Sequence, residues 1–452
     1  MEVIIIIIFV IGYLLIALEH PIKINKTATA LVTGVLCWAL FALELPNGNF
    51  IDSEHFKSFL SGLEGVDLDI TESYHRFIKS ELSHHLADIS GILFFLMGAM
   101  TIVELVDAHQ GFRYITDRIK THDIRKLLWV VCWLAFFLSA VLDNLTTAIV
   151  MVSLTRKLIK DRDQRLFFAG MIIIAANAGG AWSPIGDVTT TMLWIGGQIS
   201  SGAIIKSTFL PSIVCLLVPL IFLSFRLKGK IETRTSSIED QGELTKGSLI
   251  ILLVGIGSLI FVPIFKTITH LPPYMGMLMG LGALWVVSEI INPDADSHER
   301  KRLSPAHALS KIDTSSILFF MGILLAVGAL QSMQTLQHLA SWLGESIGDN
   351  RIIISLIGAI SAIVDNVPLV AACMGMYSME TYPMDHMIWE YLAYCAGTGG
   401  SLLVIGSAAG VAVMGMEKLD FIWYLKRISF LALLGYVAGA ATYLIMNAGS
   451  HL

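Results

Sequence analysis

A six-residue phrase occurs twice in the chain, each time inside a long apolar stretch. Residues 139–144 read Ser-Ala-Val-Leu-Asp-Asn, and residues 361–366 read Ser-Ala-Ile-Val-Asp-Asn. An ionised aspartate at the centre of a membrane span costs about 2.5–3.5 kcal/mol on insertion scales. Because this cost is incurred at matching places in two halves, the phrase predicts a binding site built from internal repeats. The Asp-Asn pair that ends each phrase offers carboxylate and amide oxygens, which suit small hard cations.

The same two pairs have a purely structural interpretation. Asp143 and Asp365 each precede an apolar run, and aspartate is a favoured N-cap of a following helix. Capping alone explains one such residue well, but explains two related copies less well, and one aspartate can serve both roles. We therefore retain Asp143, Asn144, Asp365 and Asn366 as candidate cation ligands.

A glycine-rich segment follows each phrase and supplies a second group of polar residues. The first reads Asn-Ala-Gly-Gly-Ala-Trp-Ser-Pro-Ile-Gly-Asp-Val-Thr-Thr over 177–190, and its counterpart lies at 397–407. Glycine and proline in mid-span break a helix and free backbone groups that only protein or a cavity can satisfy. Close helix packing is the alternative explanation for the glycines. Asp187 aligns with Ser407, so the predicted site holds three carboxylates, those of Asp143, Asp187 and Asp365.

The composition sets the protein class. Hydrophobic residues make up 55% of the 452 residues and charged residues 15%, whereas soluble domains carry about 25% charged residues. Apolar runs long enough to cross a bilayer core of about 30 Å recur along the chain. The fold class predicted is an all-α polytopic membrane protein, with no nucleic acid among its partners. The spans predicted are 2–18, 26–45, 88–106, 167–192, 207–225, 248–265, 275–291, 316–330, 390–415 and 429–447.

The two phrases lie in the middle of further apolar stretches, at about 127–154 and 352–376. A re-entrant hairpin would place each Asp-Asn pair at a tip, where half-helix ends and a wet cavity can satisfy it. Basic residues flank the first stretch on both sides, whereas Arg351 is the one basic residue beside the second. By the positive-inside rule, the first hairpin enters from the cytoplasm and the second from outside.

The two halves of the chain carry matching elements in the same order. Each half has five predicted crossings and one hairpin, and an odd number of crossings inverts the second half. We therefore predict a first repeat over 1–225 with a broken helix at about 167–192. A cytoplasmic linker follows at 226–247, and a second repeat with a broken helix at about 390–415 covers 248–452.

Three other segments carry weaker predictions. Residues 46–87, which include His84 and His85, are predicted to form an external loop with short helices. Residues 107–124 and 331–350 precede the hairpins and are either interfacial helices or ordinary loops. All five cysteines lie in apolar segments without metal-ligand spacing, so we expect buried, reduced thiols.

At these residues the chain resembles the ion transporter superfamily, and specifically the NhaD-type sodium/proton antiporters. The most specific pieces are Glu81-Leu-Ser-His-His, Leu142-Asp-Asn-Leu-Thr-Thr, Asn177 to Thr190 and Val364-Asp-Asn-Val-Pro-Leu. The resemblance implies a multi-pass protein of the cell inner membrane, or of a related organelle membrane, that exports Na⁺ or Li⁺ against H⁺ entry. It implies no enzyme activity, no cofactor and a homodimer. It also implies site roles for Asp143, Asn144, Asn177, Asp187, Thr189, Asp365, Asn366, Ser401 and Ser407.

The residues themselves predict competition between Na⁺ and H⁺ for the three carboxylates. Burial and like-charge crowding are expected to favour protonation of at least one of them near neutral pH. An alternative is a sodium-coupled carrier of an organic or inorganic anion, such as a dicarboxylate or arsenite. In a carrier of this kind the hairpin tip needs a donor for the substrate carboxylate, such as a serine hydroxyl, whereas an ionised aspartate repels a carboxylate. The aspartates at the tips of this chain therefore favour a cation. A third possibility, an intramembrane aspartyl protease, would need its two aspartates to face each other.

Overall fold

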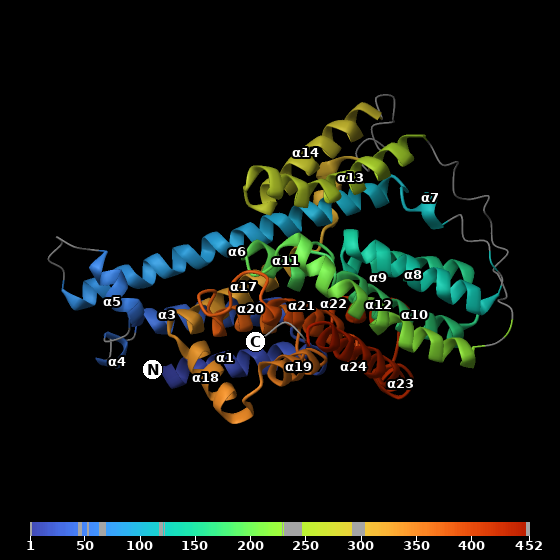
Figure 1. Cartoon of the computed structure of the whole chain (residues 1–452). Helices are drawn as coiled ribbons and strands as arrows, with labels where there is room; N and C mark the ends of the chain where they lie inside the picture. The colour runs from blue at the N-terminus through green and yellow to red at the C-terminus, as the bar shows by residue number, and fades with distance from the viewer. Residues whose placement is uncertain are drawn as a thin grey trace. The chain divides into compact units, whose positions relative to one another are not determined.

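The computed structural model describes residues 2–43, 48–51, 54–62, 69–116, 121, 123–227, 229, 246–291 and 303–448. The regular elements in these ranges are all helices (Figure 1). Eight of the described helices are long and apolar enough to cross a membrane: α3, α6, α8, α12, α13, α14, α17 and α24. The chain is therefore an all-helical polytopic membrane protein. Most of the predicted linker, 228 and 230–245, lies outside the described residues.

The chain divides into two compact units, and α6 (Ile70–Ala108) and α20 (Asn366–Met376) contribute residues to both. The first unit comprises Met1–Leu93, Asp313–Gly348 and Ala371–Thr381. Its helices are α1 (Glu2–Ala17), α2 (Glu19–Ile22), α3 (Lys26–Leu43), α4 (Gly48–Ile51), α5 (Glu54–Ser61), α17 (Thr314–Ser332) and α18 (Thr335–Ile347). Helix α3 packs along both α1 and α17.

The crossing of α3 and α17 depends on two glycines. A Cβ on Gly34 would overlap the backbone oxygen of Gly322, and a Cβ on Gly322 would lie 2.6 Å from the backbone of Ala30. The indole N–H of Trp38 donates across the same interface to the carbonyl of Leu325 at 2.8 Å. The absence of side chains at the two glycines thus lets the two backbones approach closely.

Gly322→Ala should therefore destabilise the protein, because the added methyl group meets backbone that cannot move aside. Overpacking of this kind costs about 1–3 kcal/mol. Gly344→Ala on α18 is the matched control, since nothing lies within 4 Å of its Cβ position; there the substitution should stabilise by about 0.4–1 kcal/mol. Thermal unfolding in detergent measures both changes. Equal melting temperatures for the two variants would contradict the close crossing.

The second unit comprises Phe94–Ile312, Asp349–Val370 and Tyr382–Leu452. Its helices are α7 (Arg113–Thr116), α8 (Ile124–Leu142), α9 (Asn144–Leu158), α10 (Arg162–Gly180), α11 (Val188–Ile195), α12 (Ser201–Arg226), α13 (Lys246–Thr269), α14 (Pro273–Ile291), α16 (Pro305–Lys311), α19 (Asn350–Ile360), α21 (Met387–Gly399), α22 (Ala408–Glu417), α23 (Phe421–Arg427) and α24 (Ser429–Met446). Helix α13 lies along α14, and α12 lies along α24. Helix α10 packs against α8, α9, α12, α21 and α22, which places it at the centre of this unit.

Both glycine-rich segments interrupt a helix. The first interruption separates α10 from α11, and the second separates α21 from α22. The second member of each pair begins with an equivalent cap, because Asp187 accepts from the backbone N–H of Thr189 and Ser407 accepts from that of Gly410. Aspartate and serine are both good N-caps, so the alignment of Asp187 with Ser407 corresponds to the same structural position.

The segment 46–87 differs from its prediction. Short helices α4 and α5 are present, but α6 begins at Ile70 and runs for 39 residues without a break. No glycine or proline occurs between Ile70 and Gly91, so nothing stops the helix in that stretch. Tyr74 and Phe77 also bury their rings in an aromatic cluster with Phe41 and Phe50. Tertiary packing thus stabilises polar helical turns that the sequence pattern had placed in a loop.

Two smaller predictions have clear outcomes. All five cysteines are free and buried, as expected. Of the two stretches that precede the repeated phrases, 331–350 contains the amphipathic helix α18, whereas the described part of 107–124 contains only the short helix α7. Asp123 caps α8. The backbone N–H of Lys126 donates a hydrogen bond to its carboxylate, and this bond holds the pKa of the exposed carboxyl below its ordinary value.

Candidate cation site

The amide of Asn177 connects residues from both halves of the chain. It accepts from the Asn144 amide at 3.0 Å, and it donates to the hydroxyl of Ser401 at 2.9 Å and of Ser407 at 3.0 Å. Asn177 is completely buried in the last turn of α10. Five of the predicted residues therefore meet at this point once Asp187 is included, since Asn144 also donates to its carboxylate at 2.8 Å.

Asp187 is 2% exposed and accepts three hydrogen bonds. The backbone N–H and the hydroxyl of Thr189 both donate to Oδ1 at 2.9 Å, while Asn144 donates to Oδ2. A carboxylate offers about four lone-pair sites, so capacity for one more ligand remains. No lysine or arginine forms an ion pair with Asp187 in the described part of the chain. Its charge is held by neutral donors alone, as a cation site requires.

The two repeated aspartates flank this centre. Asp143 accepts from the backbone N–H of Thr146 at 2.7 Å and from its hydroxyl at 2.9 Å, and Asp365 accepts from the backbone N–H of Val367 at 3.2 Å. The capping interpretation is therefore correct for both. The charges of Asp143 and Asp365 also act on Asp187, so the three carboxylates lie within electrostatic range of one another.

The backbone of Asp143 is strained. Its φ of 81° and ψ of 159° lie in a region that is essentially restricted to glycine. This residue alone separates α8 from α9, whereas residues 361–365 separate α19 from α20. Strain of about 1–3 kcal/mol persists only where the surroundings impose it, and it gathers at functional sites. Asp143 is thus an aspartate in a conformation that glycine would adopt without strain.

The remaining residue, Asn366, is 5% exposed. No hydrogen bond joins it to the other eight predicted residues in the described structure. Among the described residues, no three side chains of His, Cys, Asp or Glu come close enough together to hold a metal ion. The carboxylates therefore do not surround a single point, and any cation bound here needs amide, hydroxyl or backbone oxygens beside one of them.

Equivalent packing contacts position the two halves of the site. The hydroxyl of Ser139 donates to the carbonyl of Ala176 at 2.6 Å, and that of Ser361 donates to the carbonyl of Ala396 at 3.3 Å. Each serine is the first residue of a copy of the repeated phrase. Each donates a hydrogen bond to the last turns of the helix that precedes the interruption, α10 in the first half and α21 in the second. A Cβ on Gly179 would overlap the backbone of Phe136 on α8, and a Cβ on Gly399 would overlap the backbone of Gly358 on α19. The close-packing interpretation of these glycines is thus correct alongside the helix break.

Two supporting residues were missed by the sequence reasoning. Thr146 holds the Asp143 carboxylate, and its position three residues after a cap was the available signal. Tyr424 donates its hydroxyl to the carbonyl of Ser401 at 2.8 Å. No local pattern reveals that contact, because Tyr424 lies on α23, 23 positions after Ser401 in the chain.

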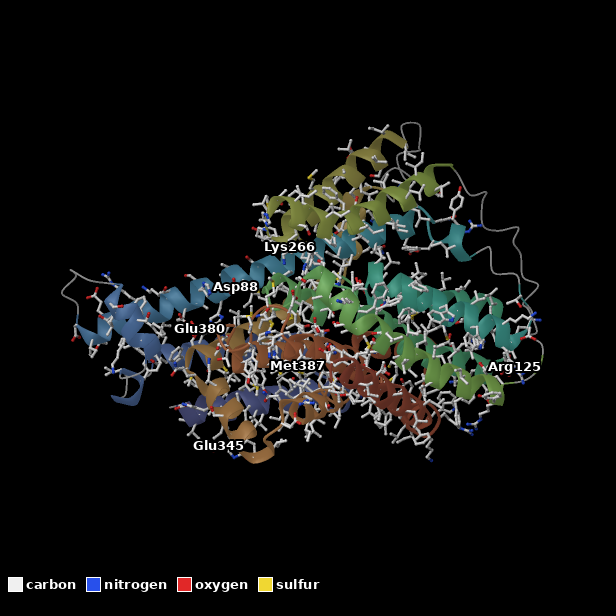
Figure 2. The ribbon with its side chains drawn as sticks, in the orientation of Figure 1. Asp88, Arg125, Lys266, Glu345, Glu380 and Met387 are labelled. Atoms are coloured by element: carbon white, nitrogen blue, oxygen red, sulfur yellow. The ribbon has the colours of Figure 1, made fainter. Side chains whose placement is uncertain are left out.

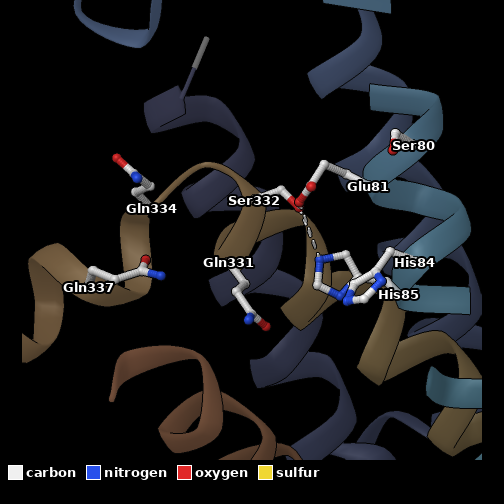
Figure 3. Close-up of a pocket in the computed structure, with 8 residues that line it drawn as sticks. All are labelled: Ser80, Glu81, His84, His85, Gln331, Ser332, Gln334 and Gln337. Carbon is white, nitrogen blue, oxygen red and sulfur yellow. Dashed lines mark hydrogen bonds and ion pairs between the residues drawn. The ribbon is translucent and has the colours of Figure 1, made fainter. Parts of the chain in front are cut away.

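A separate polar pocket lies within the first unit (Figure 3). Its cavity of about 370 Å³ is lined by Ser80, Glu81, His84, His85, Gln331, Ser332, Gln334 and Gln337. Ser332 on α17 donates to the carboxylate of Glu81 at 2.8 Å and lies 3.0 Å from Nε2 of His85. Both residues of α6 belong to the Glu-Leu-Ser-His-His motif, which therefore joins α6 to α17.

The chain is similar to known proteins along most of its length. The family described as Citrate transporter matches residues 13–397. The chain is 47% identical to Sodium/proton antiporter 1 of Arabidopsis thaliana, over 97% of this chain and 71% of that protein. It is 44% identical to Sodium/proton antiporter 2 of the same plant, over 97% of this chain and 98% of that protein. It is 31% identical to the Na(+)/H(+) antiporter NhaD of Alkalimonas amylolytica, over 98% of this chain and 90% of that protein.

The family match includes both repeated phrases and the first glycine-rich segment, and the matches to the three antiporters cover 97–98% of this chain. They describe secondary transporters, for which the ions are substrates and not cofactors. The chain belongs to the NhaD-type sodium/proton antiporters, within the family described as Citrate transporter.

Proposed function

We propose that this protein exchanges cytoplasmic Na⁺ or Li⁺ for external H⁺ at the site around Asp187. The observation that carries the proposal is a buried carboxylate held by amide and hydroxyl groups without a basic partner. Oxygen ligands of this kind suit a small hard cation. Na⁺ and H⁺ would compete for the carboxylates of Asp143, Asp187 and Asp365.

Exchange follows if the empty, fully charged site cannot change its orientation. Crowded carboxylates without a cation or proton are costly to move through a medium of low dielectric constant. Either ion neutralises part of this charge, so the protein reorients with Na⁺ or with H⁺ bound. Asn144, Asn366, Thr189, Ser401 and Ser407 would complete the oxygen shell together with half-helix carbonyl ends.

We infer that the site is built from two inverted repeats, 1–225 and 248–452, with re-entrant hairpins at about 127–154 and 352–376. The matching serine contacts, Gly-Gly contacts and helix caps of the two halves support this inference. The inverted arrangement would let each half open the site to one side of the membrane. From the family resemblance we also propose that the protein is a homodimer and lies in the cell inner membrane.

A second candidate is a sodium-coupled anion carrier, which the family description Citrate transporter favours. A carrier of this kind would need hydroxyl or basic groups free to hold a carboxylate substrate. In the described site the hydroxyls of Ser401 and Ser407 accept from Asn177 and keep their own O–H donors. The carboxylate of Asp187 in the same network, however, would repel an anion, and no basic side chain of the described residues pairs with it. The cation exchanger is therefore the better-supported function.

The test uses purified protein in proteoliposomes with an imposed pH gradient and a fluorescent pH indicator. Addition of Na⁺ or Li⁺ should dissipate the gradient. K⁺ is added in a parallel experiment as the comparison cation. Citrate or succinate added with Na⁺ separates the two candidates. A response that requires the anion would reject exchange in favour of the carrier, and no response to any cation would reject both.

A further inference from the structure

Glu390 is a buried carboxylate that the proposed exchange does not yet use. It lies in the first turn of α21, which begins at Met387 (Figure 2), and it is 8% exposed. The hydroxyl of Tyr443 on α24 donates to its Oε2 at 3.0 Å. The side chain of Ser207 on α12 also lies beside this carboxylate, while its hydroxyl donates to the carbonyl of Ala203 at 2.8 Å. No basic side chain of the described residues forms an ion pair with it. An ionisable group held in this way within a membrane protein is costly to retain for stability alone.

A helix N-terminus does favour a nearby negative charge. That effect needs no burial, since an exposed carboxylate in the first turn interacts with the same dipole at a lower desolvation cost. The partners of Glu390 also differ from those of a structural ion pair. Tyr443 and Ser207 are hydroxyls, which can donate to a carboxylate and accept from a carboxylic acid. The surroundings therefore accommodate both protonation states.

The position of Glu390 relates it to the cation site. Gly397 follows it by seven residues, so the two share one face of α21 at a separation of about 10 Å along the axis. A Cβ on Gly397 would lie 3.1 Å from the Cβ of Ala181 and 3.9 Å from Oδ2 of Asp187. The face of α21 that carries Glu390 thus leads directly to the carboxylate at the centre of the site.

Helix α12 supplies hydroxyl groups beside this face. Ser207 contacts Glu390, and the next residue, Thr208, lies with its Oγ1 3.3 Å from the carbonyl oxygen of Ala181. Ala181 is the C-cap of α10, at the interruption that ends with Asp187. Ser207, Thr208 and the carbonyl of Ala181 therefore form a series of polar groups that extends from Glu390 toward the interruption that ends with Asp187.

We propose that Glu390 is a second proton-carrying residue, which takes a proton from solvent near residues 382–386 and passes it to Asp187. This inference rests on the proposed Na⁺/H⁺ exchange. A proton from solvent first binds a carboxylate oxygen of Glu390. It then leaves that oxygen as a carboxylate oxygen of Asp187 gains a proton, and any intervening hydroxyl or water gives up one proton as it accepts another. The titratable and charged groups that act on Glu390 are Tyr443 of α24, Lys206 of α12 and Asp385 before α21, with His386 as the cap of its helix.

The decisive variant is Glu390→Gln, which keeps the shape and the hydrogen bond from Tyr443 but cannot carry a proton. We expect Na⁺/H⁺ exchange to fall about tenfold or more, most at alkaline pH where protons are scarce. Exchange of ²²Na⁺ for Na⁺ uses the cation site without net proton movement and should stay within about twofold of the unmodified protein. Glu390→Asp should restore part of the proton-coupled rate.

Glu345→Gln is the control, because Glu345 is an exposed acidic residue of α18 (Figure 2) and should leave both rates unchanged. If Glu390→Gln does not fold, Tyr443→Phe removes the hydroxyl donor and should shift the pH profile of Na⁺/H⁺ exchange while sparing Na⁺/Na⁺ exchange. An unchanged pH profile, or equal loss of both rates, would overturn the role of Glu390. Absence of exchange in the unmodified protein would instead reject the proposed function.

Discussion

Asp187→Asn should abolish Na⁺-dependent proton movement while leaving the protein folded. The substitution removes the charge at the centre of the site but retains one oxygen, which can still accept from the backbone N–H and the hydroxyl of Thr189. The new amide nitrogen replaces the oxygen that accepts from Asn144. Hydrogen bonds and contacts to a charged group contribute about 1.5–3 kcal/mol, which corresponds to a loss of about 10- to 150-fold in apparent Na⁺ affinity. Because the same group would bind the competing proton, coupling should fail together with binding. Dissipation of an imposed pH gradient in proteoliposomes measures the effect.

Asp88→Asn is the control for this variant, because Asp88 lies on α6 with 69% of its side chain exposed and pairs with His84 at 3.6 Å. It should exchange ions at the normal rate. Asp143→Asn and Asp365→Asn should each reduce exchange severely, since both carboxylates act on Asp187. Full activity in all three variants at the site would reject the carboxylate mechanism, provided that the unmodified protein exchanges Na⁺.

Asn177→Ala should lower both stability and transport. The amide of Asn177 is the common partner of Asn144, Ser401 and Ser407. Its removal leaves the buried hydroxyl of Ser401 without this donor, at about 1–3 kcal/mol for a group left unsatisfied. It also takes one hydrogen bond each from Asn144 and Ser407, which keep their bonds to Asp187 and Gly410. The two halves of the site would also lose their direct connection. Thermal unfolding in detergent and the ΔpH assay together measure the expected losses.

A matched substitution separates the loss of this particular amide from the loss of any asparagine. Asn447→Ala removes a half-buried amide that donates to the carbonyl of Tyr443 at the end of α24, outside the cation site. It should change the melting temperature little and leave exchange intact. If Asn177→Ala melts and transports like Asn447→Ala, then Asn177 does not join the halves in the way that its hydrogen bonds indicate.

The sequence was sufficient to predict the class of protein, and it nominated the residues that we propose to hold a cation. Apolar runs, helix-breaking glycines and the repeated Asp-Asn pair are local signals, and each corresponds to a local physical cost: burial of polar backbone, loss of helix geometry, or burial of charge. The interruptions after Gly180 and Gly399 therefore occur where the glycine-rich segments predict them. The alignment of Asp187 with Ser407 likewise identified two equivalent helix caps.

The tertiary structure decided which of these residues meet. Asn177 and Ser401 are 224 positions apart in the chain, and no local pattern specifies their contact. Packing also extended α6 back to Ile70, selected a strained backbone for Asp143 and placed Glu390 on the face of α21 that leads to Asp187. The reason is that helix formation and charge burial depend on neighbours within a few residues, whereas side-chain contacts depend on how helices cross, which small residues and distant partners determine together.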